Sequence, residues 1–254
     1  MTLTFTEYTS LQEKLILFNH GAKYGQIVIL AGGAGSGKSF VVHNFLESEK
    51  YKIIDIDEWK KSFIKLKTYP EWEDYDAKDP KKVAKLQLWI MRHKVRDRIL
   101  DMLFRDTKRN KEVLPNILFD ISLASYKQLQ EIVDLAKEGG YRPENIHLVY
   151  VITDWEIALN RNRGRDRQLD DGVVLKTLEQ AAGTFMRMLE SGFPQGFDGA
   201  VKMVMTHNKE PEYITVKKEG GHILSEKGVI DIVKETIQKF TGGMPPKLEK
   251  KEDA

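Results

Sequence analysis

Short apolar runs alternate with longer amphipathic stretches along this chain, and the alternation predicts the fold. The apolar runs at 26–31, 51–57, 116–120, 146–152 and 201–205 are typical of buried strands, and 213–216 is expected to return beside the last of them as a hairpin. The stretches at 8–19, 40–46, 126–137, 155–160, 173–190 and 226–240 are predicted as helices. Strands that alternate with helices imply a three-layer α/β fold, with a mainly parallel five-stranded sheet covered on both faces.

A long, highly charged region from about Glu58 to Val113 separates the second and third predicted strands. Its apolar residues between 84 and 104 recur near helical spacing, so we predict a helical insertion. Five aromatic residues stand among its lysines, and they either pack in a core or stack on a base or sugar: Trp59, Tyr69, Trp72, Tyr75 and Trp89. We predict one domain over residues 1–241 and a disordered tail over 242–254.

Composition restricts the class of protein. The 254 residues are enough for a sizeable core, and the formal net charge of +2 creates no chain-wide field that favours nucleic acid or a membrane. Because there is no cysteine, disulfides, thiolate metal sites and cysteine nucleophiles are excluded. The first residues lack the basic start and apolar run of a secretory signal, and no apolar stretch approaches the about 20 residues of a membrane span. We therefore expect a cytoplasmic protein.

The most specific motif follows the first predicted strand. Residues 32–39 fit the phosphate-binding loop pattern G-x-x-x-x-G-K-[ST], with a strand before them and a helix after them. In such a loop the backbone N–H groups cradle a nucleotide phosphate, the lysine reaches the β- and γ-phosphates, and the last hydroxyl binds Mg²⁺. The predicted ATP-binding residues are Gly33, Ala34, Gly35, Ser36, Gly37, Lys38 and Ser39. The alternative, an ordinary glycine-rich turn, does not explain this context.

Acidic residues end two of the other predicted strands. Ligands of parallel sheets bind at the carboxyl ends of the strands, which gathers the loop, Asp57 and Asp120 on one rim. Asp57 is either a general base for an acceptor hydroxyl or the cap of a helix that starts at Glu58. Asp120 either positions Mg²⁺ and binds substrate or is an ordinary loop carboxylate, and Ser122 is a weaker substrate-binding candidate.

Four arginines alternate with other residues around Gly164: Arg161, Arg163, Arg165 and Arg167. Guanidinium groups on a mobile lid would neutralise the charge that develops on a transferred phosphoryl group, and Arg165 would also contact ATP. The alternative is a solvated basic turn on the surface. Lys60, close to Asp57, either touches an anionic acceptor or is solvated.

Several pieces of the chain, in order, resemble the zeta-toxin and polynucleotide-kinase branch of the P-loop kinases. These are 33–39 (GAGSGKS), 54–60 (IDIDEWK), 117–122 (ILFDIS), 156–164 (EIALNRNRG) and 169–174 (LDDGVV). The resemblance covers about 25–190 and implies a P-loop fold. It also implies that Asp57 is the general base and that Lys60 binds an anionic group of the acceptor. Arg161 and Arg163 would stabilise the transferring phosphate. Unlike simpler kinases, this chain carries the 58–113 insertion. Similar kinases occur in plasmid and phage genomes.

The resulting prediction is an ATP- and Mg²⁺-dependent phosphotransferase that moves the γ-phosphate of ATP to a hydroxyl. Zeta toxins of the resembled kind phosphorylate a nucleotide sugar, so a small molecule of that type is the first candidate acceptor. One alternative acceptor is a nucleotide or nucleic acid, which would require a basic groove at Lys60, Lys61, Lys65 and Lys67. Another alternative is a non-catalytic ATP-dependent switch protein, although such a protein needs no general base. The sequence names no antitoxin-like partner.

Overall fold

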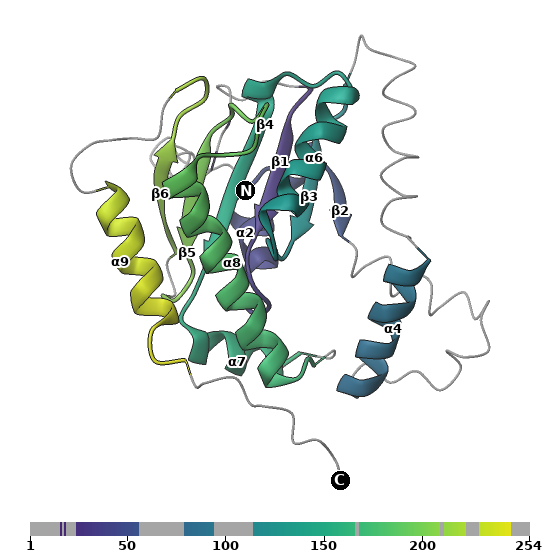
Figure 1. The fold of residues 1–254 in the computed structure, drawn as a ribbon, viewed down its shortest axis with the longest axis vertical. Helices are drawn as coiled ribbons and strands as arrows, with labels where there is room; N and C mark the ends of the chain where they lie inside the picture. The colour runs from purple at the N-terminus through teal and green to yellow at the C-terminus, as the bar shows by residue number, and fades with distance from the viewer. Residues whose placement is uncertain are drawn as a thin grey trace, which may run out of the picture.

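In the described part of the chain, six strands form one sheet in the order β2-β3-β1-β4-β5-β6 (Figure 1). The computed structural model describes residues 16, 18, 24–55, 79–93, 114–165, 168–208, 211–221 and 229–244. The strands are β1 (Ile27–Ala31), β2 (Lys52–Asp55), β3 (Ile117–Ile121), β4 (Ile146–Ile152), β5 (Val201–Met205) and β6 (Glu212–Lys217). The predicted α/β class with a mainly parallel sheet is confirmed.

The first five strands are parallel, and β6 returns antiparallel to β5 as the predicted hairpin. β6 joins the same sheet, so the sheet has six strands in the described residues rather than the five predicted. β1 lies between β3 and β4, although both follow it by many residues in sequence. The chain reverses direction across the sheet at β1, and such a switch point is where parallel sheets bind ligands.

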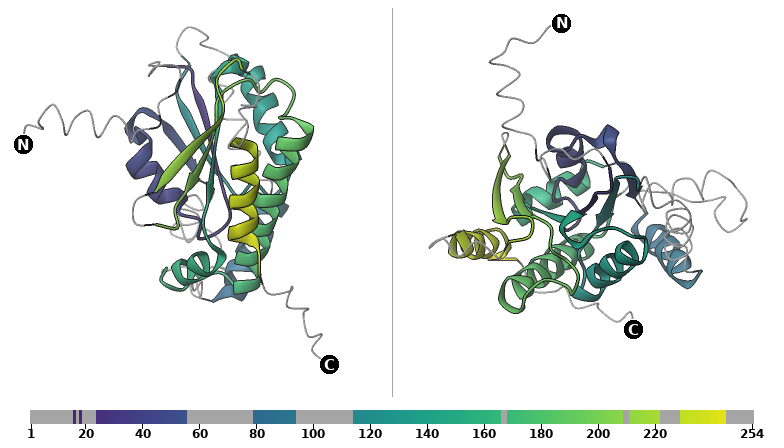
Figure 2. Two further views of the ribbon diagram at one scale, coloured as in Figure 1. Left: turned by 90° about the vertical axis from the view of Figure 1, so that its left-hand side faces the viewer. Right: turned by 90° about the horizontal axis from the view of Figure 1, so that it is seen from above.

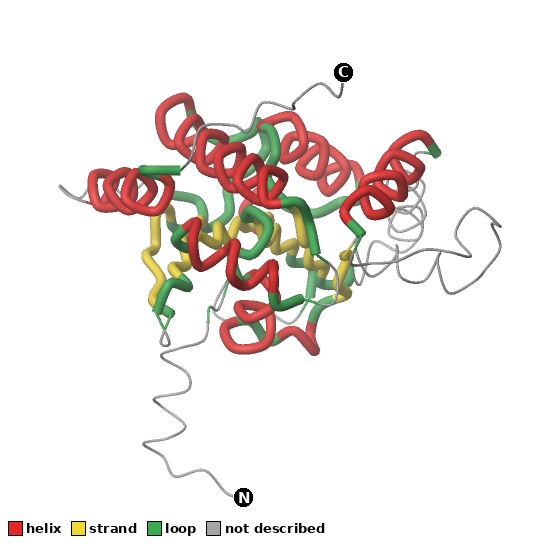
Figure 3. The backbone as a smooth tube through the Cα atoms, turned by 90° about the horizontal axis from the view of Figure 1, so that it is seen from below, coloured by secondary structure: helices red, strands yellow, loops and turns green. Residues whose placement is uncertain are grey.

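Helices cover both faces of the sheet (Figures 2 and 3). The helices are α2 (Lys38–Phe45), α4 (Pro80–Arg92), α6 (Tyr126–Glu138), α7 (Trp155–Arg163), α8 (Asp171–Ser191) and α9 (Val229–Thr241), with short 3₁₀ turns at Ser48–Lys50 and Pro143–Asn145. α6, α8 and α9 cover one face and α2 the other, while α4 lies on the side of the sheet where β2 forms the edge (Figure 1). None of these helices has the length and apolar character that a membrane crossing requires.

The strand β1 shows how the sequence builds this core. All five of its residues are buried, and successive side chains point to opposite faces. Ile27 and Ile29 join the cluster that includes α6, α8 and α9, whereas Val28 and Leu30 pack with Val41 of α2. A strand with helices on both sides must be apolar at every position, which is why residues 27–31 lack the alternation of a half-exposed strand.

Several predictions fall on residues outside the described ones. These are the amphipathic segment at 8–19 apart from Ile16 and Phe18, Asp57, Lys60, Arg167, and most of the 58–113 insertion and of the 242–254 tail. Within the insertion, α4 confirms helix at Pro80–Arg92, and the Trp89 ring stacks on His93 with centroids 4.2 Å apart. Some helix boundaries differ from expectation: α2 and α8 each begin two residues earlier, and α7 continues through Arg163 instead of ending near Asn160. The last turn of α7 closes on Gly164, whose N–H donates to the Asn160 carbonyl oxygen.

Candidate functional site

The loop that leaves β1 packs so closely that only glycine fits at several positions. Gly35 and Gly37 have φ angles of 77° and 93°, in the left-handed region that disfavours side chains. A Cβ atom at Gly35 would collide with the backbone of Ala158 in α7, and one at Gly37 would lie 2.9 Å from Thr206 Oγ1. The glycines of the motif therefore let the loop touch α7 and the end of β5 directly.

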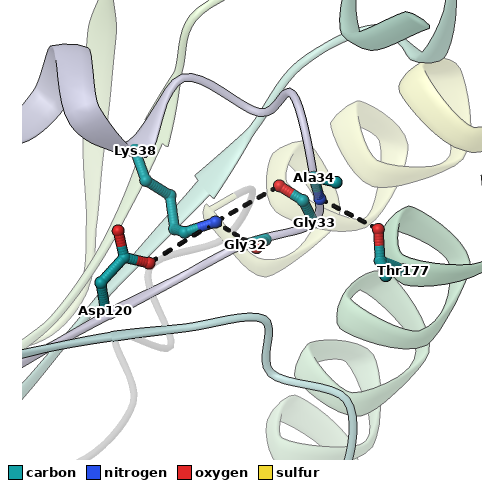
Figure 4. A network of polar contacts seen from close by, with 6 residues as sticks. All are labelled: Gly32, Gly33, Ala34, Lys38, Asp120 and Thr177. Atoms are coloured by element: carbon teal, nitrogen blue, oxygen red, sulfur yellow. Dashed lines mark hydrogen bonds and ion pairs between the residues drawn. The ribbon is translucent and has the colours of Figure 1, made fainter. Parts of the chain in front are cut away.

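Helix α8 holds the first half of the loop. The Ala34 N–H donates to Thr177 Oγ1 at 2.9 Å (Figure 4). Gly33 lies against Leu178, where an added Cβ would come within 2.8 Å of the Leu178 Cα. The neighbouring Ser36 is 1% exposed, and its Oγ has no hydrogen-bond partner among the described residues. Helix α8 thus packs against the first half of the loop, and the buried Ser36 hydroxyl has no hydrogen-bond partner among the described residues.

The loop ends at the positive end of a helix. α2 begins at Lys38 after Gly37, and within the described chain no side chain caps its first N–H groups. Its first turn has no acidic residue. Free N–H groups and the helix dipole together make such a terminus a site for an anion. A phosphate group therefore fits this position by geometry and by charge.

Lys38 lies across the mouth of the loop (Figure 4). Its Nζ donates to the Gly32 carbonyl oxygen at 2.9 Å and to that of Gly33 at 3.5 Å, and it lies 3.6 Å from Asp120 Oδ1. The side chains of Lys38 and Asp120 are 17% and 18% exposed, so their ion pair is largely shielded from water. The structure thus brings together two residues predicted from separate motifs.

The acid of β3 reaches the loop because of the strand order. Asp120 is in register with Leu30 of β1, and Leu30 packs on the side of α2. Ser39, on the first turn of α2, is exposed. A carboxylate and a hydroxyl oxygen are hard ligands of the kind that Mg²⁺ uses together with nucleotide phosphates. The described residues contain no cluster of three or more metal-binding side chains, and magnesium held mainly by phosphates needs none.

The turn after β3 continues this rim. Ser122 is partly buried. The next residue, Leu123, is fully buried and has a φ of 54°, which is unusual for a residue with a side chain. Ser125 then caps α6 by accepting the Gln128 N–H at 3.3 Å. The buried Leu123 side chain therefore fixes a sharp turn beside the predicted substrate residue.

The three described arginines of the basic stretch lie in different environments. Arg161 points at the loop: its Nη1 lies 3.4 Å from the Gly35 carbonyl oxygen and 3.0 Å from Thr206 Oγ1. Burial, with a contribution from the charge of Arg165, lowers the pKa of Arg161 from its ordinary value. Arg163 instead pairs with Asp171 Oδ2 at 2.5 Å on the surface, and Arg165 is exposed.

Sequence reasoning missed three residues that shape the site. Thr177 and Thr206 bind the loop from α8 and from the end of β5, and the rule that ligands gather at carboxyl strand ends could have found Thr206. Buried Asn162 closes the link between α7 and α8, because its Nδ2 donates to the Leu169 carbonyl at 2.8 Å and its Oδ1 accepts the Leu169 N–H at 3.0 Å. No local pattern marks Thr177 or Asn162.

The fold and the loop together define a P-loop nucleotide-binding protein of the α/β class. The model of the AAA domain family (AAA_33) matches residues 27–188, from the start of β1 to the last turns of α8. The chain therefore belongs to the AAA domain family. The P-loop fold implied by the resemblance is confirmed. A comparison with curated proteins found no match.

Solved structures with a similar fold include complexes of two components. The AvrRxo1-ORF1:AvrRxo1-ORF2 crystal structure with sulphate ions has a TM-score of 0.60 at 14% identity, covering 89% of this chain and 66% of that chain. The same pair with ATP has a TM-score of 0.59 at 15% identity, covering 91% and 67%. A structure of the PezAT toxin-antitoxin system of Streptococcus pneumoniae has a TM-score of 0.55 at 13% identity, covering 98% and 93%. This chain thus spans about two thirds of the AvrRxo1 chain, and the likeness shows the fold.

Proposed function

We propose that this protein is an ATP-dependent phosphotransferase of zeta-toxin-like type, which moves the γ-phosphate of ATP to a hydroxyl of a small molecule such as a nucleotide sugar. The observation that carries the proposal is the position of Lys38 beside Asp120, at the mouth of a loop that ends on an uncapped helix. A switch protein would also use such a loop. The basic stretch that begins at Arg161, beside the loop, favours transfer, because its arginines would supply charge to a phosphoryl group that leaves ATP.

Binding of ATP would exchange existing contacts for new ones. Lys38 would turn from the carbonyl oxygens of Gly32 and Gly33 towards the β- and γ-phosphates, and the first N–H groups of α2 would donate to phosphate oxygens. Ser39 and Asp120 would hold Mg²⁺, which neutralises charge on the phosphates when bound. Release of Asp120 from Lys38 would make its carboxylate available to the ion.

The acceptor would lie on the side of the loop where β2 and β3 end. Asp55 is the last described residue of β2, and its Cα pairs in register with that of Asp120. Asp57 follows two residues later, so we propose it as the base that takes the hydroxyl proton, with Lys60 and Ser122 as acceptor contacts. Arg163 and Arg165 would supply positive charge to the transferring phosphoryl group.

A partner protein forms part of the proposal. The AvrRxo1 structures contain two components, and the PezAT structure belongs to a toxin-antitoxin system. We propose that this protein, too, binds a second protein, which controls its activity in the cytoplasm.

The deciding experiment incubates the purified protein with γ-labelled ATP, Mg²⁺ and separate pools of nucleotide sugars, nucleosides and oligonucleotides. We expect label in the nucleotide-sugar fraction, and none with Lys38→Ala. Label in the oligonucleotide fraction would replace the small-molecule acceptor by nucleic acid. Binding of ATP without a labelled product in any fraction would contradict the kinase proposal and favour a switch.

A further inference from the structure

A phosphate-binding loop has a second requirement besides inward N–H groups. When successive N–H groups turn towards an anion, the carbonyl groups of the same peptides turn away from it and need partners of their own. In this loop the Ser36 carbonyl oxygen accepts the Thr206 hydroxyl at 2.6 Å. The Gly35 carbonyl oxygen is contacted by Arg161 Nη1 at 3.4 Å. The outward side of the loop is therefore bound by two side chains.

Thr206 connects these contacts. Its Oγ1 donates to Ser36 and accepts from Arg161 Nη1 at 3.0 Å, and its carbonyl oxygen accepts from Arg161 Nη2 at 2.6 Å. Arg161 thus donates hydrogen bonds to both the side chain and the main chain of Thr206. Thr206 is 1% exposed, and its N–H donates to the Ile152 carbonyl oxygen, which continues the pairing of β5 with β4. We call Arg161 and Thr206 the loop anchor.

The loop anchor also fixes the point where the loop enters α2. A Cβ atom at Gly37 would lie 2.9 Å from Thr206 Oγ1 and 3.1 Å from Arg161 Nη1, so both residues touch the backbone that carries the phosphate-binding N–H groups. Charge-assisted bonds in a shielded position are among the stronger hydrogen bonds of proteins. An arginine that served the transferring phosphate would have to leave all of these contacts.

We propose that Arg161 and Thr206 are positioning residues, which hold the loop in its phosphate-binding shape before the nucleotide arrives. This inference rests on the proposed function, since it concerns how the same loop binds phosphate. It assigns Arg161 to nucleotide affinity and leaves charge neutralisation during transfer to Arg163 and Arg165. It also gives a role to Thr206, whose buried hydroxyl is bound to Ser36 and Arg161.

The test measures the Kd for ADP by calorimetry, together with kcat and KM for ATP. Thr206→Val keeps the size of the side chain and removes the hydroxyl, which leaves the Ser36 carbonyl without its donor. We expect its Kd for ADP to rise about tenfold. Thr206→Ser should restore the affinity to within about twofold, because the hydroxyl returns. The matched control is Thr215→Val, a threonine of β6 whose Oγ1 binds Lys202. Its ADP affinity should equal that of the parent.

Arg161→Lys separates positioning from catalysis, because lysine cannot bind both oxygens of Thr206 with a planar fork. The loop anchor predicts a raised Kd for ADP. It also predicts that combining Arg161→Lys with Thr206→Val adds little, since both changes release the same contact. A lower kcat with unchanged ADP affinity in Arg161→Lys, or parental affinity in Thr206→Val, would overturn the inference. If Thr206→Val does not fold, Arg161→Lys and Thr206→Ser decide. A parent protein that does not bind ADP would instead contradict the proposed function.

Discussion

The carboxyl edge of the sheet, where the parallel strands end, and the amino edge, where they begin, both carry buried or partly buried polar side chains. The polar groups of the two edges bind different partners. At the carboxyl edge of the parallel strands, Lys38, Arg161, Thr177 and Thr206 direct their polar groups to the backbone of the phosphate-binding loop. At the amino edge, polar side chains bind the ends of the strands themselves. The first edge thus shapes a loop for a ligand, whereas the second completes the sheet.

At the amino edge, polar side chains link neighbouring strands to one another. Asn116 Oδ1 accepts the Gln26 N–H at 3.0 Å, so the starts of β3 and β1 are joined. His147 Nδ1 accepts the Ala200 N–H at 3.1 Å and joins β4 to β5. Lys217 Nζ, at the end of β6, donates to Asp198 Oδ1 at 2.9 Å. The first two bonds satisfy backbone N–H groups beside strand ends, and the third pairs the largely buried Lys217 ammonium group.

The difference predicts which property each edge controls. Removing a side chain at the carboxyl edge should impair binding or transfer more than stability, because these side chains bind the loop and not the paired strands. Removing one at the amino edge should change stability and leave kinetics intact. Four experiments test this division.

The largest effect is expected for Lys38→Ala. Loss of the only predicted cation of the loop should lower ATP turnover by about 10³-fold or more, because charge stabilisation in a shielded site is strong. Release of label from γ-labelled ATP measures it. The control is Lys218→Ala, an exposed lysine just after β6. Turnover at the parental rate in Lys38→Ala would remove the loop from the chemistry.

The second test is Asp57→Asn, at a residue that the described part of the chain does not include. As the proposed general base, Asp57 should contribute about 10²–10⁴-fold to transfer and little to nucleotide affinity. Asp134→Asn, on an exposed turn of α6, is the matched control. Labelled product formed at an unchanged rate by Asp57→Asn would eliminate Asp57 as the base.

The third test compares the two partners of one surface ion pair. Arg163→Ala and Asp171→Ala both break the pair between side chains that are 59% and 38% exposed, so each should change the free energy of unfolding by at most about 1 kcal/mol. Only Arg163→Ala should lower kcat, by about 10²-fold, because only the arginine is proposed to act on the phosphoryl group. Equal kcat values for both variants would assign Arg163 to the surface alone.

The smallest effect concerns acid stability at the amino edge. Burial, with smaller contributions from the charges of Lys202 and Lys217, lowers the pKa of His147 to about 3. His147 therefore stays neutral in the folded protein, while the unfolded chain binds its proton near pH 6.5. The free energy of unfolding should fall as the pH drops from 6.5 towards 3, by about 2 kcal/mol at pH 5.

Urea unfolding at pH 7 and pH 5 measures this loss. His147→Asn keeps an oxygen acceptor for the Ala200 N–H and removes the titrating ring. Unfolding of the variant at pH 5 should therefore take up about one proton fewer, and its free energy of unfolding should change less between pH 7 and pH 5. Its kcat and KM at pH 7 should match those of the parent. An identical pH dependence in both proteins would show that His147 is not the group that titrates.

The sequence by itself determined the elements and the heart of the site. The apolar run at 27–31 and the glycine pattern after it are local signals, because a buried strand and a tight loop each require particular residue types at consecutive positions. Hence the α/β class, the hairpin of β6 and the placement of Lys38 and Asp120 at one rim could be predicted from short stretches. Asp57, Lys60 and the disordered tail stay predictions.

Only the tertiary structure decided what surrounds that loop. The strand order puts β3 beside β1, which makes Asp120 the partner of Lys38. Thr177 and Thr206 bind loop residues that lie 143 and 170 positions away in sequence. A single threonine carries no sign of such a contact, because a hydrogen bond between distant segments depends on how the chain packs and not on its neighbours. The residues proposed to bind phosphate could therefore be predicted from the sequence, whereas those proposed to hold them in place could not.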